Sequence, residues 1–192
     1  MVLGVAAIVL MILVFMWVRK QRDERGGSRK EWPPDKEMIR EAERLVKVRV
    51  TPSFPYSFAR MKPGVFQHID RRYTYDVVPE ELVGGFLFQG IHRPPKGTAI
   101  EFELSAAATV YWFFHPGGDG GYGPIFEQLE GWERCEQFPQ YDIHNGDHGL
   151  RMVMYRRHAG PGTYRIPATT ADRACFNIVF QPEPVFSNSS ER

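Results

Sequence analysis

The sequence predicts a mainly β protein: an antiparallel, jelly-roll-like β-sandwich preceded by an N-terminal transmembrane helix and a short amphipathic helix. Three observations support this fold class. A charge-free apolar run opens the chain, apolar residues alternate with a period of two from Val46 onward, and Gly, Pro and Asn separate the alternating segments. The 192 residues leave room for one domain behind the anchor, and the net charge of +1 argues against a general nucleic-acid binder.

Residues 1–18 are predicted to be a transmembrane anchor. The run from Val2 to Val18 holds no charged residue. About 17 residues at about 1.5 Å each give about 25 Å of helix, which suits a thin, endomembrane-like bilayer. A cleaved signal peptide would have a basic start and small residues before its cleavage site. Met1 leads directly into the apolar run and Trp17 lies near its end, so we interpret the run as an uncleaved anchor.

The charges that follow the anchor predict its orientation. Arg19, Lys20, Arg22 and Arg25 lie on its C-terminal side. The positive-inside rule then places the N-terminus outside and the domain in the cytoplasm. These four residues are expected at the membrane surface. Together with the anchor, they lead us to expect that residues 1–30 contact membrane lipid. A lumenal or extracellular domain is the alternative.

A basic juxtamembrane linker, residues 19–35, is predicted from its polar composition and its Gly-Gly-Ser run. Asp35 then supplies an N-cap for an amphipathic helix from about Lys36 to Val46. Apolar residues recur at helical spacing along this helix, and charged residues occupy its other face. The helix and a lead-in strand together make up residues 36–62.

The β-sandwich itself is predicted over residues 63–182. The segment Thr109–Phe114 is apolar on both alternating faces, as expected of a central strand that is covered on both sides. One internal helix is expected near Ile125 to Trp132, and the tail, residues 183–192, lacks periodicity and is predicted to be disordered. The expected strands are Val46–Thr51, Val65–Ile69, Tyr73–Val78, Gly85–Gln89, Ala99–Leu104, Thr109–Phe114, Leu150–Arg156, Thr163–Ile166 and Cys175–Gln181.

Three motifs carry a resemblance to a known family. The sequence reads H-I-D-R-R-Y-T-Y at residues 68–75, V-P-E-E-L-V-G at 78–84 and A-T-V-Y at 108–111. These motifs resemble D-R-x-Y-T-F, V-P-x-x-L-x-G and P-A-T-V-Y-V of a β-sandwich accessory domain in secreted bacterial carbohydrate-active and sugar-oxidising proteins. The resemblance covers roughly Pro63 to Gln181. It implies a non-catalytic module that can contact sugars, and it assigns no site residues.

A candidate binding site lies near the glycine-rich loop at Gly117 to Gly123, with a plain mobile loop as the favoured alternative. Tyr122 is expected to be exposed there, and with Asp119 and Arg93 it would form a platform with hydrogen-bonding edges for a sugar or a peptide. The loop also matches G-x-G-x-x-G, but no repeated strand-helix pattern accompanies it, as a dinucleotide site would require. We therefore expect no cofactor.

A metal site is considered at His144 and His148, which are four residues apart, with His115 as a third ligand. Asn145-Gly146 is a strong two-residue hairpin turn signal, and such a turn would place the two histidines on opposite faces. We therefore interpret them as surface hairpin residues and expect no metal.

The two cysteines, Cys135 and Cys175, have no other Cys or His at zinc-ligand spacing in the sequence. They could form one disulfide if the domain faces an oxidising lumen, whereas both would stay reduced in the cytoplasm. In that case Cys175 would be an ordinary core residue.

The sequence as a whole predicts a single-pass, membrane-anchored, non-enzymatic β-sandwich module that binds a protein partner. The alternative is a carbohydrate-binding module on the lumenal or extracellular side. A metal-dependent enzyme is the third interpretation, disfavoured because no nucleophile, base and orienting group can be assembled from the sequence.

Overall fold

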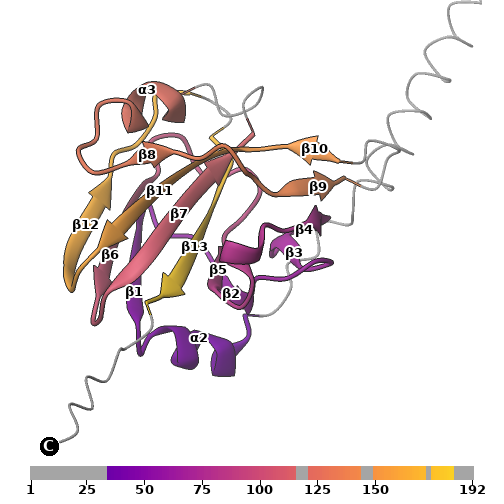
Figure 1. The fold of residues 1–192 in the computed structure, drawn as a ribbon, viewed down its shortest axis with the longest axis horizontal. Helices are drawn as coiled ribbons and strands as arrows, with labels where there is room; N and C mark the ends of the chain where they lie inside the picture. The colour runs from indigo at the N-terminus through magenta and orange to yellow at the C-terminus, as the bar shows by residue number, and fades with distance from the viewer. Residues whose placement is uncertain (1–33, 116–120, 144–148, 172–173, 184–192) are drawn as a thin grey trace, which may run out of the picture.

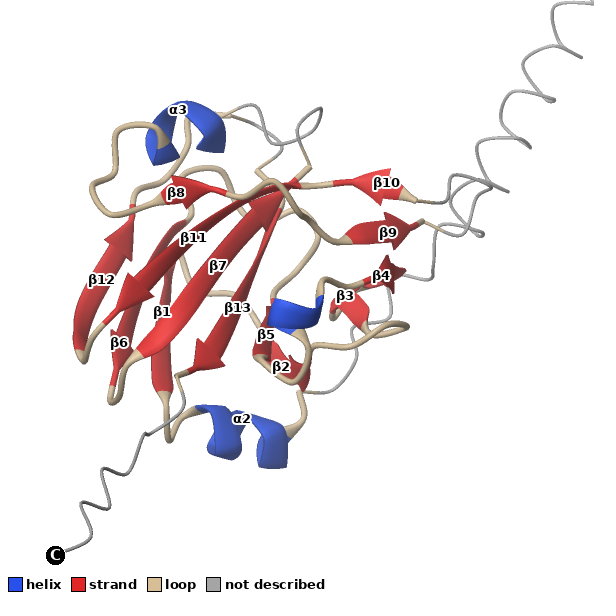
Figure 2. Ribbon diagram, in the orientation of Figure 1, coloured by secondary structure: helices blue, strands red, loops and turns tan. Residues whose placement is uncertain are grey.

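The structure is a computed structural model that describes residues 34–115, 121–143, 149–171 and 174–183. These residues form antiparallel sheets with few helical segments, which agrees with the predicted mainly β fold (Figure 1, Figure 2). The predicted anchor, the basic residues that follow it and the tail from residue 184 lie outside the described residues. Within the described part, no helix is both long and apolar enough to cross a membrane.

The elements follow one another with short connections. Their bounds are α2 Lys36–Ala42, β1 Val46–Thr51, β2 Ser57–Arg60, β3 Phe66–His68, β4 Arg71–Val77, η1 Glu80–Leu82, β5 Phe86–Gln89, β6 Ala99–Leu104, β7 Ala108–Phe114, α3 Tyr122–Phe126, β8 Glu133–Arg134, β9 Gln140–Asp142, β10 Leu150–Arg151, β11 Val153–Ala159, β12 Gly162–Ile166 and β13 Phe176–Pro182.

A six-stranded sheet in the order β2-β5-β13-β7-β11-β8 forms the centre of the described structure. Every residue of β7 is buried, which confirms the prediction that this segment is a central strand covered on both faces. Its neighbours β13 and β11 pair with it along seven residues each. Side chains of β7 therefore alternate between two separate apolar cores.

A three-stranded sheet in the order β1-β6-β12 covers one face of the central sheet. Its apolar side chains, such as Val50, Ile100 and Phe102, are buried in the same core as Trp112 of β7 and Phe180 of β13. The rings of Phe102 and Phe180 meet edge to face across the two sheets, with their centroids 5.3 Å apart. This packing of two antiparallel sheets is that of a β-sandwich.

A small four-stranded sheet in the order β10-β9-β4-β3 lies beside one end of the central sheet, at the right of Figure 1. Tyr75 of β4 and Tyr141 of β9 share a second core with Leu87, Phe113 and Met154 of the central sheet. Leu82 of η1 is buried in this second core as well. The central sheet is thus covered on both faces, but by different sheets.

The helix α2 begins as predicted and ends earlier. The carboxylate of Asp35 accepts hydrogen bonds from the backbone N–H groups of Glu37 and Met38, both at 3.0 Å. The helix ends at Ala42 rather than Val46. Leu45 N–H then donates to the Ala42 carbonyl at 2.9 Å, which turns the chain into β1.

Several sequence predictions need correction. The strand predicted at Leu150–Arg156 is two strands, because β10 pairs in the small sheet and β11 in the central sheet. The predictions also missed β2, β8 and β9, which are two to four residues long and too short to show alternation. The internal helix is α3, Tyr122–Phe126, and lies earlier than predicted, because Tyr122 and Phe126 are the residues that pack on Trp112.

We predict that Phe113→Ala destabilises the fold by about 3–5 kcal/mol, because it removes a buried ring from a strand covered on both faces. Phe66→Ala is the matched control, since Phe66 is 36% exposed and should cost about 1 kcal/mol or less. Urea unfolding followed by circular dichroism measures both. Similar losses for the two variants would contradict the assignment of β7 as the central strand.

Candidate functional site

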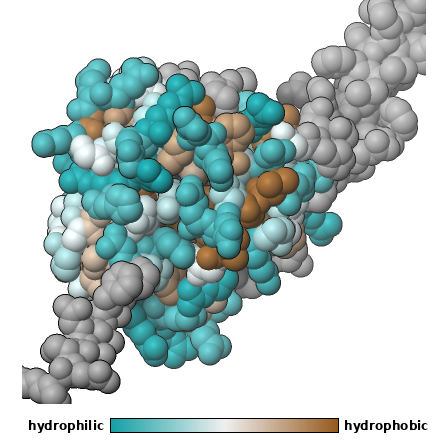
Figure 3. Space-filling view, in the orientation of Figure 1, coloured by the Kyte–Doolittle hydropathy of each residue, from teal (hydrophilic) through white to brown (hydrophobic). Residues whose placement is uncertain are grey.

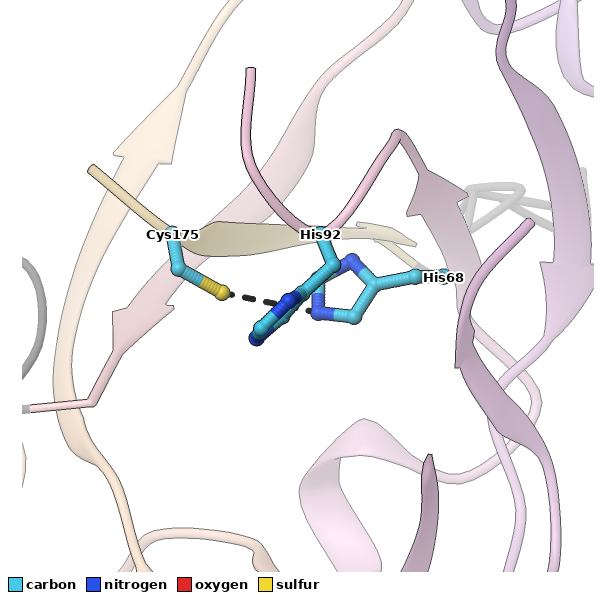
Figure 4. A group of neighbouring side chains, drawn as sticks. All are labelled: His68, His92 and Cys175. Carbon is cyan, nitrogen blue, oxygen red and sulfur yellow. Dashed lines mark hydrogen bonds between the residues drawn. The ribbon is translucent and has the colours of Figure 1, made fainter. Parts of the chain in front are cut away.

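Three side chains with metal-binding or nucleophilic chemistry meet where the small sheet joins the central sheet. His68 ends β3, His92 follows β5, and Cys175 precedes β13 (Figure 4). Their ligand atoms all lie within 4.8 Å of one another. The Sγ atom of Cys175 is 3.5 Å from Nε2 of His68. Three segments that are distant in the sequence thus form one cluster.

Asp70 holds the loop that carries His92 against the β3–β4 turn. Its Oδ1 atom accepts a hydrogen bond from the backbone N–H of His92 at 2.8 Å. Beside it, the backbone N–H of Ile69 donates to the carbonyl of Gly90 at 3.1 Å. These bonds bring the His68 and His92 rings together, with their centroids 5.2 Å apart.

Asn177 holds the small sheet on the central sheet. This residue is fully buried on β13. Its Oδ1 atom accepts a hydrogen bond from the Tyr75 hydroxyl at 2.8 Å, and its Nδ2 group donates to the Gln67 carbonyl at 2.7 Å. Since Gln67 precedes His68 and Asn177 lies two residues after Cys175, the same bonds set the position of the imidazole relative to the thiol.

Both histidines of the cluster are held in the neutral form. Burial lowers the pKa of His68 well below its usual range, and the nearby His92 and Arg71 lower it further. Burial also lowers the pKa of His92 to about 4, with smaller contributions from Arg71, Arg93 and His115. A neutral imidazole keeps one nitrogen lone pair, so each ring can accept a hydrogen bond or bind a metal near pH 7.

Both rings also have a buried nitrogen without a hydrogen bond. Among the described residues, the Nδ1 atoms of His68 and His92 have no hydrogen-bond partner. The carbonyl of Gly90 raises the pKa of His68, but it does not form a hydrogen bond with the Nδ1 atom of that ring. A buried polar atom without a partner costs about 1–3 kcal/mol. Such a cost is easier to explain at a binding site than in a purely structural core.

The cluster borders an open pocket of about 370 Å³, which we call the seam pocket. Tyrosine and imidazole rings and several apolar side chains line it, and the Arg93 side chain is exposed on its lining. The His115 ring meets the Tyr141 ring edge to face, with centroids 5.9 Å apart. The lining residues are Gln67, Tyr73, His92, Arg93, His115, Tyr141, Ile143, Leu150, Met152 and Cys175.

A second pocket, of about 430 Å³, lies between α2 and the strands β2 and β3. Its lining includes Asp35, Arg60 and Lys62, and His68 also borders it. The cluster of His68, His92 and Cys175, however, contributes two of its three residues to the seam pocket and one to this pocket. We therefore take the seam pocket as the candidate site, although it is the smaller of the two.

The prediction that Tyr122 is exposed was wrong. Its side chain is 1% exposed and packs against the rings of Trp112 and Phe176, with centroids at 5.2 and 5.5 Å. Gly121 makes this packing possible, because a Cβ atom there would lie 2.7 Å from Cβ of Thr169. The glycines around Tyr122 suggested a surface loop, but at least one of them allows close packing instead.

The other predicted site residues divide into two groups. Arg93 and His115 both border the seam pocket, so two residues predicted for different functions share one site. Asp119, His144 and His148 lie outside the described residues.

No disulfide joins Cys135 and Cys175 in the structure. Cys135 is half-buried and packs against the second core, and its backbone N–H donates to the Met154 carbonyl at 2.9 Å. Sequence reasoning treated Cys175 as an ordinary core residue and did not consider His68 or His92. The signal that it lacked is spatial, because 24 residues separate the histidines and 83 more separate His92 from Cys175.

Comparisons with known proteins show the fold and leave the family open. No protein-family model and no curated protein sequence matches this chain. The structure is similar to a β-glucuronidase from glycoside hydrolase family 2, with a TM-score of 0.57, 14% identity and 79% of this chain covered. It is also similar to a GH138 enzyme targeting pectin rhamnogalacturonan II, with a TM-score of 0.48, 11% identity and 86% of this chain covered. This chain spans 15% and 19% of those two chains.

The similarity to the β-glucuronidase supports the expected resemblance at the level of fold. A carbohydrate-active protein contains a β-sandwich like this one, as the motifs in residues 68–111 implied. At 14% identity, the similarity says nothing about individual site residues.

We predict that Tyr75→Phe lowers the free energy of unfolding by about 1–3 kcal/mol, because it leaves Oδ1 of Asn177 buried without its donor. Tyr164→Phe is the matched control, since that hydroxyl donates to the Gly160 carbonyl in an exposed hydrogen bond. The control should change stability by about 0.5 kcal/mol or less. Equal losses in urea unfolding would show that the Tyr75–Asn177 bond does not hold the sheets together.

Proposed function

We propose that this chain is a non-enzymatic β-sandwich module that binds carbohydrate in the seam pocket. The observation that carries the proposal is the chemistry of the lining. The half-buried Tyr73 offers a ring on which a sugar face can pack, while Arg93 and His115 offer hydrogen-bonding groups. The Tyr73 ring is held in place by the His92 ring, which it meets edge to face with the ring centroids 5.1 Å apart.

The solved structure with a similar fold supports a carbohydrate-related role. It is a β-glucuronidase, and this chain corresponds to 15% of its length. A segment of that size matches an accessory domain better than a complete enzyme. We therefore propose a binding role and no catalytic one.

An acidic sugar is the ligand that the described lining favours. The lining of the seam pocket includes the Arg93 guanidinium, and none of its described residues is an aspartate or glutamate. A guanidinium can bind a carboxylate through two parallel hydrogen bonds, which adds both affinity and orientation. A saccharide that contains a uronic acid would supply that carboxylate.

The anchor predicted at residues 1–18 completes the proposal by holding the module at a membrane. Binding of complex glycans requires the module to face a lumen or the cell exterior, the alternative to the side that Arg19, Lys20, Arg22 and Arg25 predict. We infer that the module faces the lumen or exterior. Protease treatment of sealed vesicles should therefore leave it intact, and digestion in sealed vesicles would contradict the inference.

Binding of a protein partner stays a prediction. The described surface that it would use is the apolar patch around η1, where Val77 and Val83 are 50% and 45% exposed. Figure 3 shows an apolar patch near η1 and β4 on a mostly hydrophilic face. A patch of this kind is small, and isolated exposed apolar residues are common on soluble domains.

We predict that Arg93→Ala weakens binding of a uronic-acid oligosaccharide at least about 10-fold, the value expected for loss of one charged hydrogen-bonding pair. Arg49→Ala is the matched control, because Arg49 lies on β1 with a 79% exposed side chain and pairs with Glu101. Isothermal titration with oligogalacturonate and with a neutral oligosaccharide measures both variants.

Two outcomes would contradict the proposal. If neither the acidic nor the neutral oligosaccharide binds the unmodified protein, carbohydrate binding is wrong. If the acidic oligosaccharide binds and Arg93→Ala and Arg49→Ala reduce affinity equally, the ligand binds outside the seam pocket.

A further inference from the structure

We propose that His68, His92 and Cys175 form a transition-metal site at the floor of the seam pocket, and that zinc is its metal. The proposal is independent of carbohydrate binding, because it concerns three side chains and an ion alone. Figure 4 shows the two imidazole rings and the thiol converging from three separate segments of the chain. Their ligand atoms lie within 4.8 Å of one another.

The spacing of the ligand atoms fits a tetrahedral ion. With a Zn–S bond of about 2.3 Å and a Zn–N bond of about 2.0–2.1 Å, sulfur and nitrogen are separated by about 3.6 Å. The Sγ atom of Cys175 and the Nε2 atom of His68 are 3.5 Å apart. The remaining pairs, at 4.8 Å or less, require only a small inward movement of the His92 side chain.

The surroundings of the ligands also fit a metal. His68 is 1% exposed, and the Nδ1 atom of His92 has no hydrogen-bond partner among the described residues. A metal ion bound here would give a buried ring nitrogen of His92 the partner that it lacks.

The donor set selects among metals. One sulfur and two imidazole nitrogens suit zinc and copper, whereas magnesium and calcium require oxygen ligands. No aspartate or glutamate belongs to the cluster among the described residues. Zinc accepts three protein ligands and leaves a fourth position open. Since His92 and Cys175 both border the seam pocket, that position would face the pocket and a ligand inside it.

The loop that carries His92 supports the same geometry. The carboxylate of Asp70 accepts a hydrogen bond from the His92 backbone N–H at 2.8 Å, and the Ile69 backbone N–H donates to the Gly90 carbonyl at 3.1 Å. Two hydrogen bonds therefore hold the loop before any ion binds. A site that is preorganised in this way loses less conformational entropy on metal binding.

The test is a titration of metal-free protein with zinc and with cobalt(II), without saccharide. We expect one equivalent of zinc to bind, and the cobalt complex to show thiolate-to-cobalt charge transfer and the visible bands of a tetrahedral ion. Cys175→Ser should abolish the charge-transfer band and weaken zinc binding at least about 100-fold. Cys135→Ser is the matched control and should change neither, because Cys135 packs against the second core and is not part of the cluster.

His92→Gln provides a second variant in case Cys175→Ser fails to fold. His92 is half-buried in a loop, and its replacement should weaken zinc binding at least about 100-fold while the thermal unfolding temperature of the metal-free protein stays similar. Zinc binding that is weak, or equal in Cys175→Ser, His92→Gln and the unmodified protein, would overturn the site. A site that takes copper and rejects zinc would overturn the choice of metal.

Discussion

Asn177 is the residue on which the packing of the small four-stranded sheet against the central sheet depends. It is buried on β13, accepts the Tyr75 hydroxyl proton at 2.8 Å and donates to the Gln67 carbonyl at 2.7 Å. One amide thus joins the central sheet to two strands of the small sheet. In an apolar core such bonds fix orientation, because each polar group has a partner only in one arrangement. His68 and Cys175 lie within two residues of this junction, so the cluster inherits its geometry.

The sequence was sufficient for the parts of the fold that depend on local pattern. The central strand at Thr109–Phe114 and the strand at Val46–Thr51 could be predicted because long runs show their burial on one or both faces. Tyr122 was misplaced because glycine-rich sequence resembles an exposed loop, whereas its burial depends on Trp112 and Phe176 from other strands. The short strands β8 and β9 exist because of their pairing partners and carry little pattern of their own.

The candidate site could be predicted only in part, for a similar reason. Arg93 and His115 were singled out from local sequence, and both border the seam pocket. The His68, His92 and Cys175 cluster has no short spacing that marks it, because the fold brings together three distant segments. The metal site that was considered and rejected from the sequence had ligands four residues apart, whereas the ligands that we propose come together at a junction between sheets. Sites of this kind follow from topology, which a single sequence shows only indirectly.

The central claim is that the junction of the two sheets is a binding site with a metal at its floor. Anomalous diffraction on either side of the zinc absorption edge tests it most directly, using crystals of metal-free protein grown with added zinc. The account predicts one strong peak within bonding distance of His68 Nε2, a His92 ring nitrogen and Cys175 Sγ. Crystals without a peak at this cluster, or with zinc bound only elsewhere, would contradict it.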